Sequence, residues 1–149
     1  TQAVLRALVA IILYQLPREK QPPSKEKERL LIDCKDYIDC HFTEELTVEK
    51  LAERSHMSVS GFAHQFKKIF GFPPIQYIIR RRIGQAQTLL ITTDLSITEV
   101  SVRVGYDNIS YFNNQFKRFA GMSPQSYRKY KVGERQFKNL NKLVPHLNS

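Results

Sequence analysis

The sequence predicts an all-α fold in which a long helix joins two similar helical units. The first observation is a repeat whose members recur 50 positions later in the same order: Phe62, Phe66, Gly71, Pro74 and Tyr77, then Phe112, Phe116, Gly121, Pro124 and Tyr127. The second is apolar spacing typical of helices, with no alternating segment long enough for a strand. The third is the 42% hydrophobic content of the 149 residues, which is enough for one ordinary domain or two small ones.

The spacing of the repeat is that of a two-helix unit. Upstream of the phenylalanines the offset falls to 49, as between Leu46 and Leu95. The second copy has therefore gained one residue between Val100 and Phe112.

Start and stop signals divide the chain into helices. Ser58 and either Asp107 or Asn108 are expected N-caps, Ser96 and Glu99 form a capping box, and Gly105 ends a helix. The predicted helices are 28–41, 47–54, 58–70, 74–92, 96–105, 108–120 and 123–130.

Three further segments lie outside the repeat. Residues 1–16 read as an apolar helix that must bury its surface. It would pack on this domain, end a preceding sensing and dimerisation domain, or form a dimer seam, and we favour the last two. Residues 17–28 have the composition of a linker, and 131–149 form a basic, irregular tail with one short helix near 136–143. Because the chain begins at Thr1, we expect it to be part of a longer protein.

Charge and cysteine content narrow the partners and the location. The net charge of +9 and the pI near 9.7 favour nucleic acid first and an anionic membrane second, against charge that serves solubility alone. The apolar stretch 3–16 contains Arg6, is too short to span a bilayer and lacks the flanks of a signal peptide. Cys34 and Cys40, six positions apart, point to different helix faces and lack metal-ligand spacing, which favours a reducing, cytoplasmic setting.

Each copy of the repeat has a short helix, a tight turn and a second helix. This order is the helix-turn-helix pattern, in which the second helix enters the DNA major groove. Residues 47–70 form the first unit, 74–92 the bridging helix and 96–120 the second unit.

Residues 29–130 as a whole resemble the DNA-binding domain of the AraC/XylS family of bacterial transcription regulators. The matching positions are 46–52, Ser58, 66–68, Gly71, Pro74, Tyr77, Arg82, Ala86, 89–90, 96–97, 104–106, 111–112, 116–117, Gly121, 123–124 and 127–128. The resemblance implies a homeodomain-like tandem whose two recognition helices reach successive major-groove segments. His56 stands where the family places glycine, so that turn is expected to be strained. Ser101 and Pro73 are milder departures.

Solvent-side positions of the two recognition helices are the candidates for DNA contact. By resemblance, base contacts fall near the helix N-termini: Ser60, Ala63, His64, Ser110, Asn113 and Asn114. Asparagine can pair bidentately with adenine, so we expect the second unit to carry more specificity. The phosphate candidates are Lys67, Lys68, Arg80, Arg81, Arg82, Lys117 and Arg118. A solvated face is the alternative for the arginine run, and structural packing is the alternative for Arg82.

The resemblance implies sequence-specific binding of double-stranded DNA by an activator that responds to a small molecule sensed elsewhere. It also implies RNA polymerase and a homodimer partner, the latter through residues 1–16 and a preceding domain. The alternatives are a nonspecific DNA-binding module and a protein-interaction module. Some DNA-alkylation-repair proteins join such a domain to a zinc-cysteine methyl acceptor, but two scattered cysteines do not form that cluster. We therefore expect no enzyme activity, no catalytic or metal site, no cofactor and no membrane partner.

Overall fold

The computed structural model describes residues 2, 4 and 25–143, with side chains described as far as residue 139. Within 25–143 it is entirely helical, as predicted. The helices are α2 (Lys25–His41), α3 (Val48–Arg54), α4 (Val59–Phe70), α5 (Pro74–Thr92), α6 (Ile97–Arg103), α7 (Ile109–Ala120) and α8 (Pro124–Leu143). The predicted helix at 1–16 and most of the predicted linker lie outside the described residues. No helix in the described part combines the length and apolarity needed to cross a membrane.

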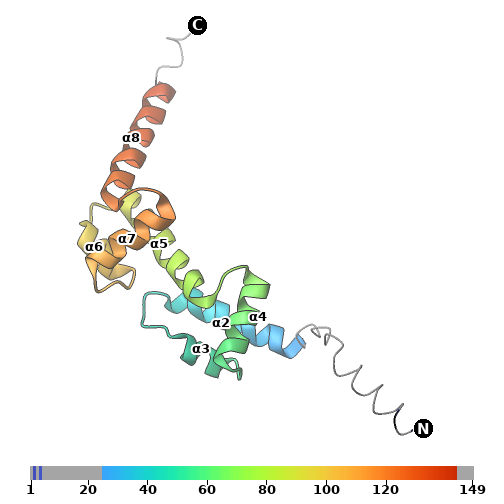
Figure 1. The fold of residues 1–149 in the computed structure, drawn as a ribbon. Coiled ribbons are helices and arrows are strands. Elements are labelled where there is room, and N and C mark those ends of the chain that lie inside the picture. Colours follow the sequence, from blue (N-terminus) through green and yellow to red (C-terminus); the bar gives the residue numbers. More distant parts are fainter. Residues whose placement is uncertain (1, 3, 5–24, 144–149) are drawn as a thin grey trace.

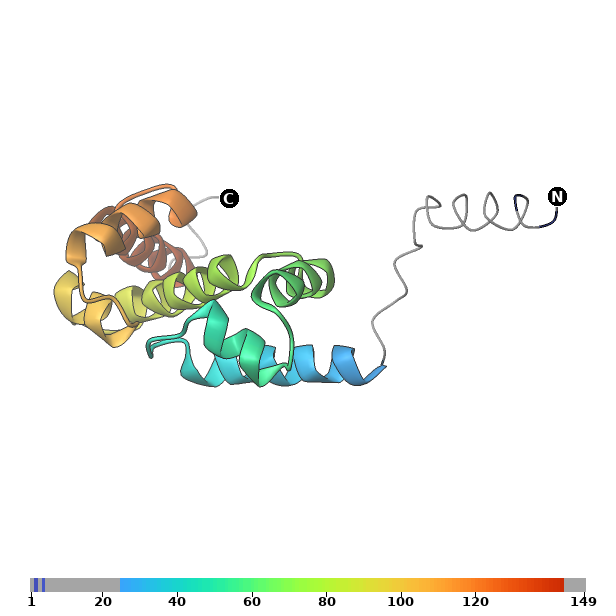
Figure 2. The ribbon, with the colours of Figure 1, turned by 60° about the horizontal axis from the view of Figure 1, so that its bottom comes forward.

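The helices form two units at opposite ends of α5 (Figure 1, Figure 2). In the first, α2, α3 and α4 enclose a core that includes Phe62 and Phe66, both fully buried. In the second, α6, α7 and α8 surround α5, and Phe112 and Phe116 are fully buried. The bridging helix belongs to both units, because Ile78 lies in the first core and the next residue, Ile79, lies in the second.

The two units repeat in three dimensions as they do in sequence. The Phe66 and Tyr77 rings meet edge to face at 5.6 Å, and their counterparts Phe116 and Tyr127 do so at 5.5 Å. Gly71 and Gly121 end α4 and α7 in the left-handed conformation, with φ of 84° and 79°. The repeat therefore specifies equivalent helix geometry and not merely similar composition.

The caps of the repeated helices also correspond. Thr47 and Ser96 cap α3 and α6, and the capping box of Ser96 with Glu99 is confirmed. Ser58 caps α4, and Asn108 rather than Asp107 caps α7 by accepting from the Tyr111 N–H. These side chains satisfy N–H groups that a helix leaves unpaired at its start.

The extra residue of the second copy lies in its turn. Four residues, 55–58, separate α3 from α4, whereas five residues, 104–108, separate α6 from α7. Within the turns, Met57 N–H donates to Ala52 O, and Tyr106 N–H donates equivalently to Ser101 O. The insertion therefore follows Tyr106 and shifts the start of α7 by one residue.

His56 has φ of 53°, and it is the one non-glycine residue with positive φ in the described segment. Its counterpart in the second turn is Gly105, with φ of 92°. The strained first turn expected from the sequence is thus confirmed, because the left-handed region costs a residue with a Cβ roughly 1–2 kcal/mol.

Three element boundaries differ from the sequence prediction. Helix α2 begins at Lys25, so residues 25–28 of the predicted linker are helical. Helix α6 ends at Arg103, and Gly105 follows it in the turn. Helix α8 continues past residue 130 to Leu143, and it projects away from the second unit (Figure 1). Pairs one turn apart, such as Lys131 with Glu134 at 2.9 Å, support this extension.

Candidate nucleic-acid interface

Helix α4 buries one face and exposes the other. Phe62 and Phe66 anchor it in the core, so the positions between them turn outward. Ser60 and His64 are exposed, and Ala63 between them is half-buried. The three predicted base-contact positions thus lie on one outward stripe, with Ala63 least accessible.

Helix α7 presents the same stripe with more polar chemistry. Ser110, Asn113 and Asn114 are all exposed, and Lys117 continues their line one turn later. A shallow groove of about 380 Å³ runs beside them. Its remaining walls come from the start of α6, with Thr98, and the start of α8, with Gln125. Two amide side chains that can both donate and accept therefore border a hollow wide enough to be entered.

Four cations flank the recognition stripes near the helix ends. Lys67 and Lys68 occupy the last turn of α4, and Lys117 and Arg118 occupy the last turn of α7. All four side chains are exposed, and none makes an ion pair within the described residues. Their charges remain available to an anionic partner.

The arginine run of α5 has partners inside the protein, which corrects one phosphate-contact prediction. Arg82 is half-buried, and it donates from Nε to Phe42 O at 2.6 Å and from Nη2 to Glu44 O at 2.7 Å. Its structural role was the alternative that the sequence left open. Burial lowers the pKa of Arg82 and raises that of the neighbouring Tyr106 phenol to about 12, so the phenol stays neutral. With its donors directed inward, Arg82 is not a phosphate ligand.

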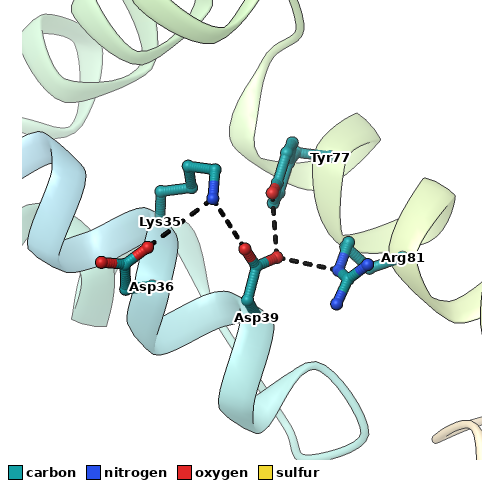
Figure 3. Close-up of polar contacts among 5 residues, drawn as sticks. All are labelled: Lys35, Asp36, Asp39, Tyr77 and Arg81. Carbon is teal, nitrogen blue, oxygen red and sulfur yellow. Dashed lines mark hydrogen bonds and ion pairs between the residues drawn. The ribbon is translucent and has the colours of Figure 1, made fainter.

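Arg81 belongs to a polar cluster between α2 and α5 (Figure 3). Asp39 Oδ1 accepts from the Tyr77 hydroxyl and from Arg81 Nε, both at 2.8 Å, and Oδ2 accepts from Lys35 Nζ at 2.7 Å. Burial alone would raise the pKa of Asp39, but hydrogen bonds from Lys35 and Tyr77 and the Arg81 charge hold it below its ordinary value. The sequence gave little sign of this cluster, because its members come from helices about forty residues apart.

Arg80 lies between two aromatic rings. Its Cζ is 4.0 Å from the centroid of Phe72 and 5.1 Å from that of Phe119. The side chain is exposed, so its role as a phosphate contact remains a prediction that competes with this packing.

Tyr111 is a candidate contact that the sequence analysis did not include. It lies in the first turn of α7 beside Ser110, and 50% of its surface is exposed. Its phenol can donate to a phosphate oxygen. The available signal was its place next to Phe112, one helical step away from the inward stripe.

A helix-turn-helix domain model matches residues 51–130, which is more than half of the chain. The chain belongs to the AraC family of helix-turn-helix DNA-binding domains. It is similar to the uncharacterized HTH-type transcriptional regulator YdiP of Escherichia coli (strain K12), with 40% identity over 114 residues, 76% of this chain and 36% of YdiP.

Two further relatives of this AraC-type domain carry more specific descriptions. The bifunctional transcriptional activator/DNA repair enzyme AdaA of Bacillus subtilis (strain 168) is 34% identical over 128 residues, which is 86% of this chain and 59% of AdaA. The solved DNA-binding domain of the global transcriptional factor AdpA, in complex with a target DNA, has a TM-score of 0.69 and 34% identity. That alignment covers 72% of this chain and 96% of the AdpA domain. The chain thus spans between about a third and three fifths of these two curated relatives, YdiP and AdaA.

The two cysteines of this AraC-type domain lie in different environments, as predicted. Cys34 is buried, and its Sγ is 2.9 Å from Ser55 Oγ, whereas Cys40 is exposed. Burial raises the pKa of the Cys34 thiol. The chain's family and fold are those of transcription regulators and not of enzymes.

Proposed function

We propose that the chain binds double-stranded DNA sequence-specifically, with α4 and α7 in successive major-groove segments on one face of the duplex. The observation that carries this proposal is the pair of matching outward stripes on two equivalent helices held by one continuous α5. Major-groove edges distinguish all four base pairs, and an α-helix fits that groove.

In this proposal each stripe reads bases, and the cations beside it hold the backbone. The base contacts are Ser60, Ala63, His64, Ser110, Asn113 and Asn114. The phosphate contacts are Lys67, Lys68, Lys117 and Arg118. Phosphate contacts set register and affinity, whereas base contacts set sequence. The amides of α7 offer stronger base readers than the side chains of α4, so the second unit carries more of the specificity.

Selection of bound duplexes from a random library at near-physiological salt tests this reading. Two short enriched boxes about one helical turn apart, roughly 34–36 Å, are expected. A single enriched box would show that only one unit reads sequence. Binding without enrichment would contradict the proposal and favour nonspecific attachment through the basic surface.

The regulation of the longer protein extends the same proposal. We propose a cytoplasmic activator that contacts RNA polymerase, responds to a small molecule sensed outside this chain, and forms a homodimer in which residues 1–16 take part. The description of AdaA as a transcriptional activator supports activation. Deletion of residues 1–16 should lower self-association in analytical ultracentrifugation and leave DNA affinity intact. Unchanged self-association would refute the role of that segment in dimerisation.

A further inference from the structure

Three consecutive arginines in the middle of α5 leave the helix in three directions, because each residue turns the helix by about 100°. Arg80 and Arg82 are therefore about 200° apart and lie on nearly opposite faces. The described partners of both residues come from the two units on either side of α5.

Arg80 connects the units on one face of the bridging helix. Phe72 lies in the loop that follows α4 in the first unit, and Phe119 lies near the end of α7 in the second. The guanidinium of Arg80 is within 4.0 Å of one ring centroid and 5.1 Å of the other. Its planar cation can attract both ring faces, so it restrains α7 relative to the end of α4.

Arg82 connects the units on the other face. It holds the loop after α2 through the carbonyls of Phe42 and Glu44, and its Cζ lies 5.4 Å from the ring centroid of Tyr106 in the second turn. The same loop presses on that turn directly: a Cβ built on Gly105 would lie 2.5 Å from Thr43 O. The loop of the first unit and the turn of the second therefore meet beside Arg82.

Arg81 differs from its neighbours in that its partners belong to the first unit alone. It pairs with Asp39 on α2, and its Cζ lies 5.3 Å from the Phe42 ring centroid. It fastens α5 to α2 without reaching the second unit. The chain thus offers a matched control one residue away from each of the two connecting arginines.

We infer that Arg80 and Arg82 are positioning residues that fix the orientation of α4 relative to α7, and thereby the spacing between DNA boxes that the protein accepts. The spacing consequence rests on the proposed function. One base pair added between the boxes moves the second by about 3.4 Å and rotates it by about 35°. A joint restrained on both faces of α5 resists such a change, whereas a joint free on both faces follows it.

The joint is tested first without DNA. Spin labels at Glu53→Cys and Val102→Cys, equivalent exposed positions on α3 and α6, report the distance between the units in a Cys40→Ser background. Cys34 remains because it is buried, and a protein without the two added cysteines shows its background labelling. Methionine replaces arginine in each variant, since it keeps an aliphatic stem and loses the donors.

Electron-electron resonance should give a narrow distance distribution for the parent and for Arg81→Met. The Arg80→Met and Arg82→Met double variant should give a broader one. The Arg81→Met control loses an ion pair, so it separates reduced stability from reduced positioning. A double variant with the parental distribution would overturn the inference.

The consequence for DNA is measured as a ratio within each protein, so that any lost phosphate contact cancels. Duplexes carry the two selected boxes at the native spacing or with one base pair added. The parent and Arg81→Met should lose about tenfold in affinity with the added base pair, because misplaced base contacts are forfeited. The double variant should lose only about threefold, since a loosened joint lets both boxes be reached.

The possible failures are distinguishable. If the parent selects two boxes and the double variant keeps the full spacing penalty, the positioning inference is wrong and the proposed function stands. If the parent selects no boxes, the proposed function and the spacing consequence both fail. The label distances then still decide whether the arginines fix the two units.

Discussion

Replacement of Gly105 by alanine is expected to destabilise the protein more than the same change at Gly121. Both glycines have positive φ, 92° and 79°, and alanine would be strained at either position by roughly 1–2 kcal/mol. They differ in their surroundings. A Cβ at Gly121 meets nothing within 4 Å, whereas a Cβ at Gly105 would lie 2.5 Å from Thr43 O.

The close contact at Gly105 is with backbone, so no rotamer change can relieve it. The loop carrying Thr43 must move, and Arg82 holds that loop by hydrogen bonds of 2.6 and 2.7 Å to Phe42 O and Glu44 O. Loss of one hydrogen bond to a charged group costs about 1.5–3 kcal/mol. Gly105→Ala should therefore cost about 3–5 kcal/mol in total, against about 1–2 kcal/mol for Gly121→Ala.

Urea unfolding followed by circular dichroism measures both variants, with the free energy of unfolding taken from the midpoint and the slope. Gly71→Ala, with φ of 84° and open space around its Cβ, is a second control. Equal destabilisation of Gly105→Ala and the two controls, within about 0.5 kcal/mol, would show that the loop does not press on the second turn.

Other expectations follow from single side chains. His56→Gly should stabilise the protein by up to about 1 kcal/mol, because it removes left-handed strain, and a loss of unfolding free energy would contradict this. Asp39→Asn should cost about 2 kcal/mol at pH 7. Because the folded-state pKa of Asp39 is lowered, its contribution is present above the unfolded value, near 3.9, and lost as pH falls through the folded value; a difference that stays constant down to pH 2 would exclude that role. Lys117→Ala should reduce the slope of log affinity against log salt by about 0.9, whereas an unchanged slope would remove it from the phosphate contacts. Asn114→Ala should cost about 1–3 kcal/mol and relax preference at one base position, and an unchanged selected sequence would refute base contact.

The repeat and its caps could be predicted because their signals are local. Ser58 and Ser96 precede their helices directly, and Gly71 follows the last turn of α4, so each acts within a few residues of its own position. The exposed stripes of α4 and α7 follow from the same reasoning, since Phe62 and Phe112 fix which face turns inward. No measurement has yet tested which of those exposed side chains touch DNA.

The arginine run shows where such reasoning ends. Its charge suggested an anionic partner, but the partners of Arg82 are backbone carbonyls of Phe42 and Glu44. Every residue carries a carbonyl, so residue type cannot reveal this contact forty positions away. The length of α8 was missed for a related reason: Gly133 and the dense charge resembled a tail, whereas Lys131 and Glu134 support a continuing helix.

The sharing of α5 between two cores has a consequence during synthesis. The first core is complete once Ile78 has been made, whereas Leu90, on the same helix, waits for Phe116 to cover it. That interval is 26 residues (116 − 90), which a ribosome translates in roughly 1–5 s. During this time the newly made chain carries a finished unit with one apolar helix flank still open. The second unit therefore folds against a surface that is already in place, and chaperones meet that surface first.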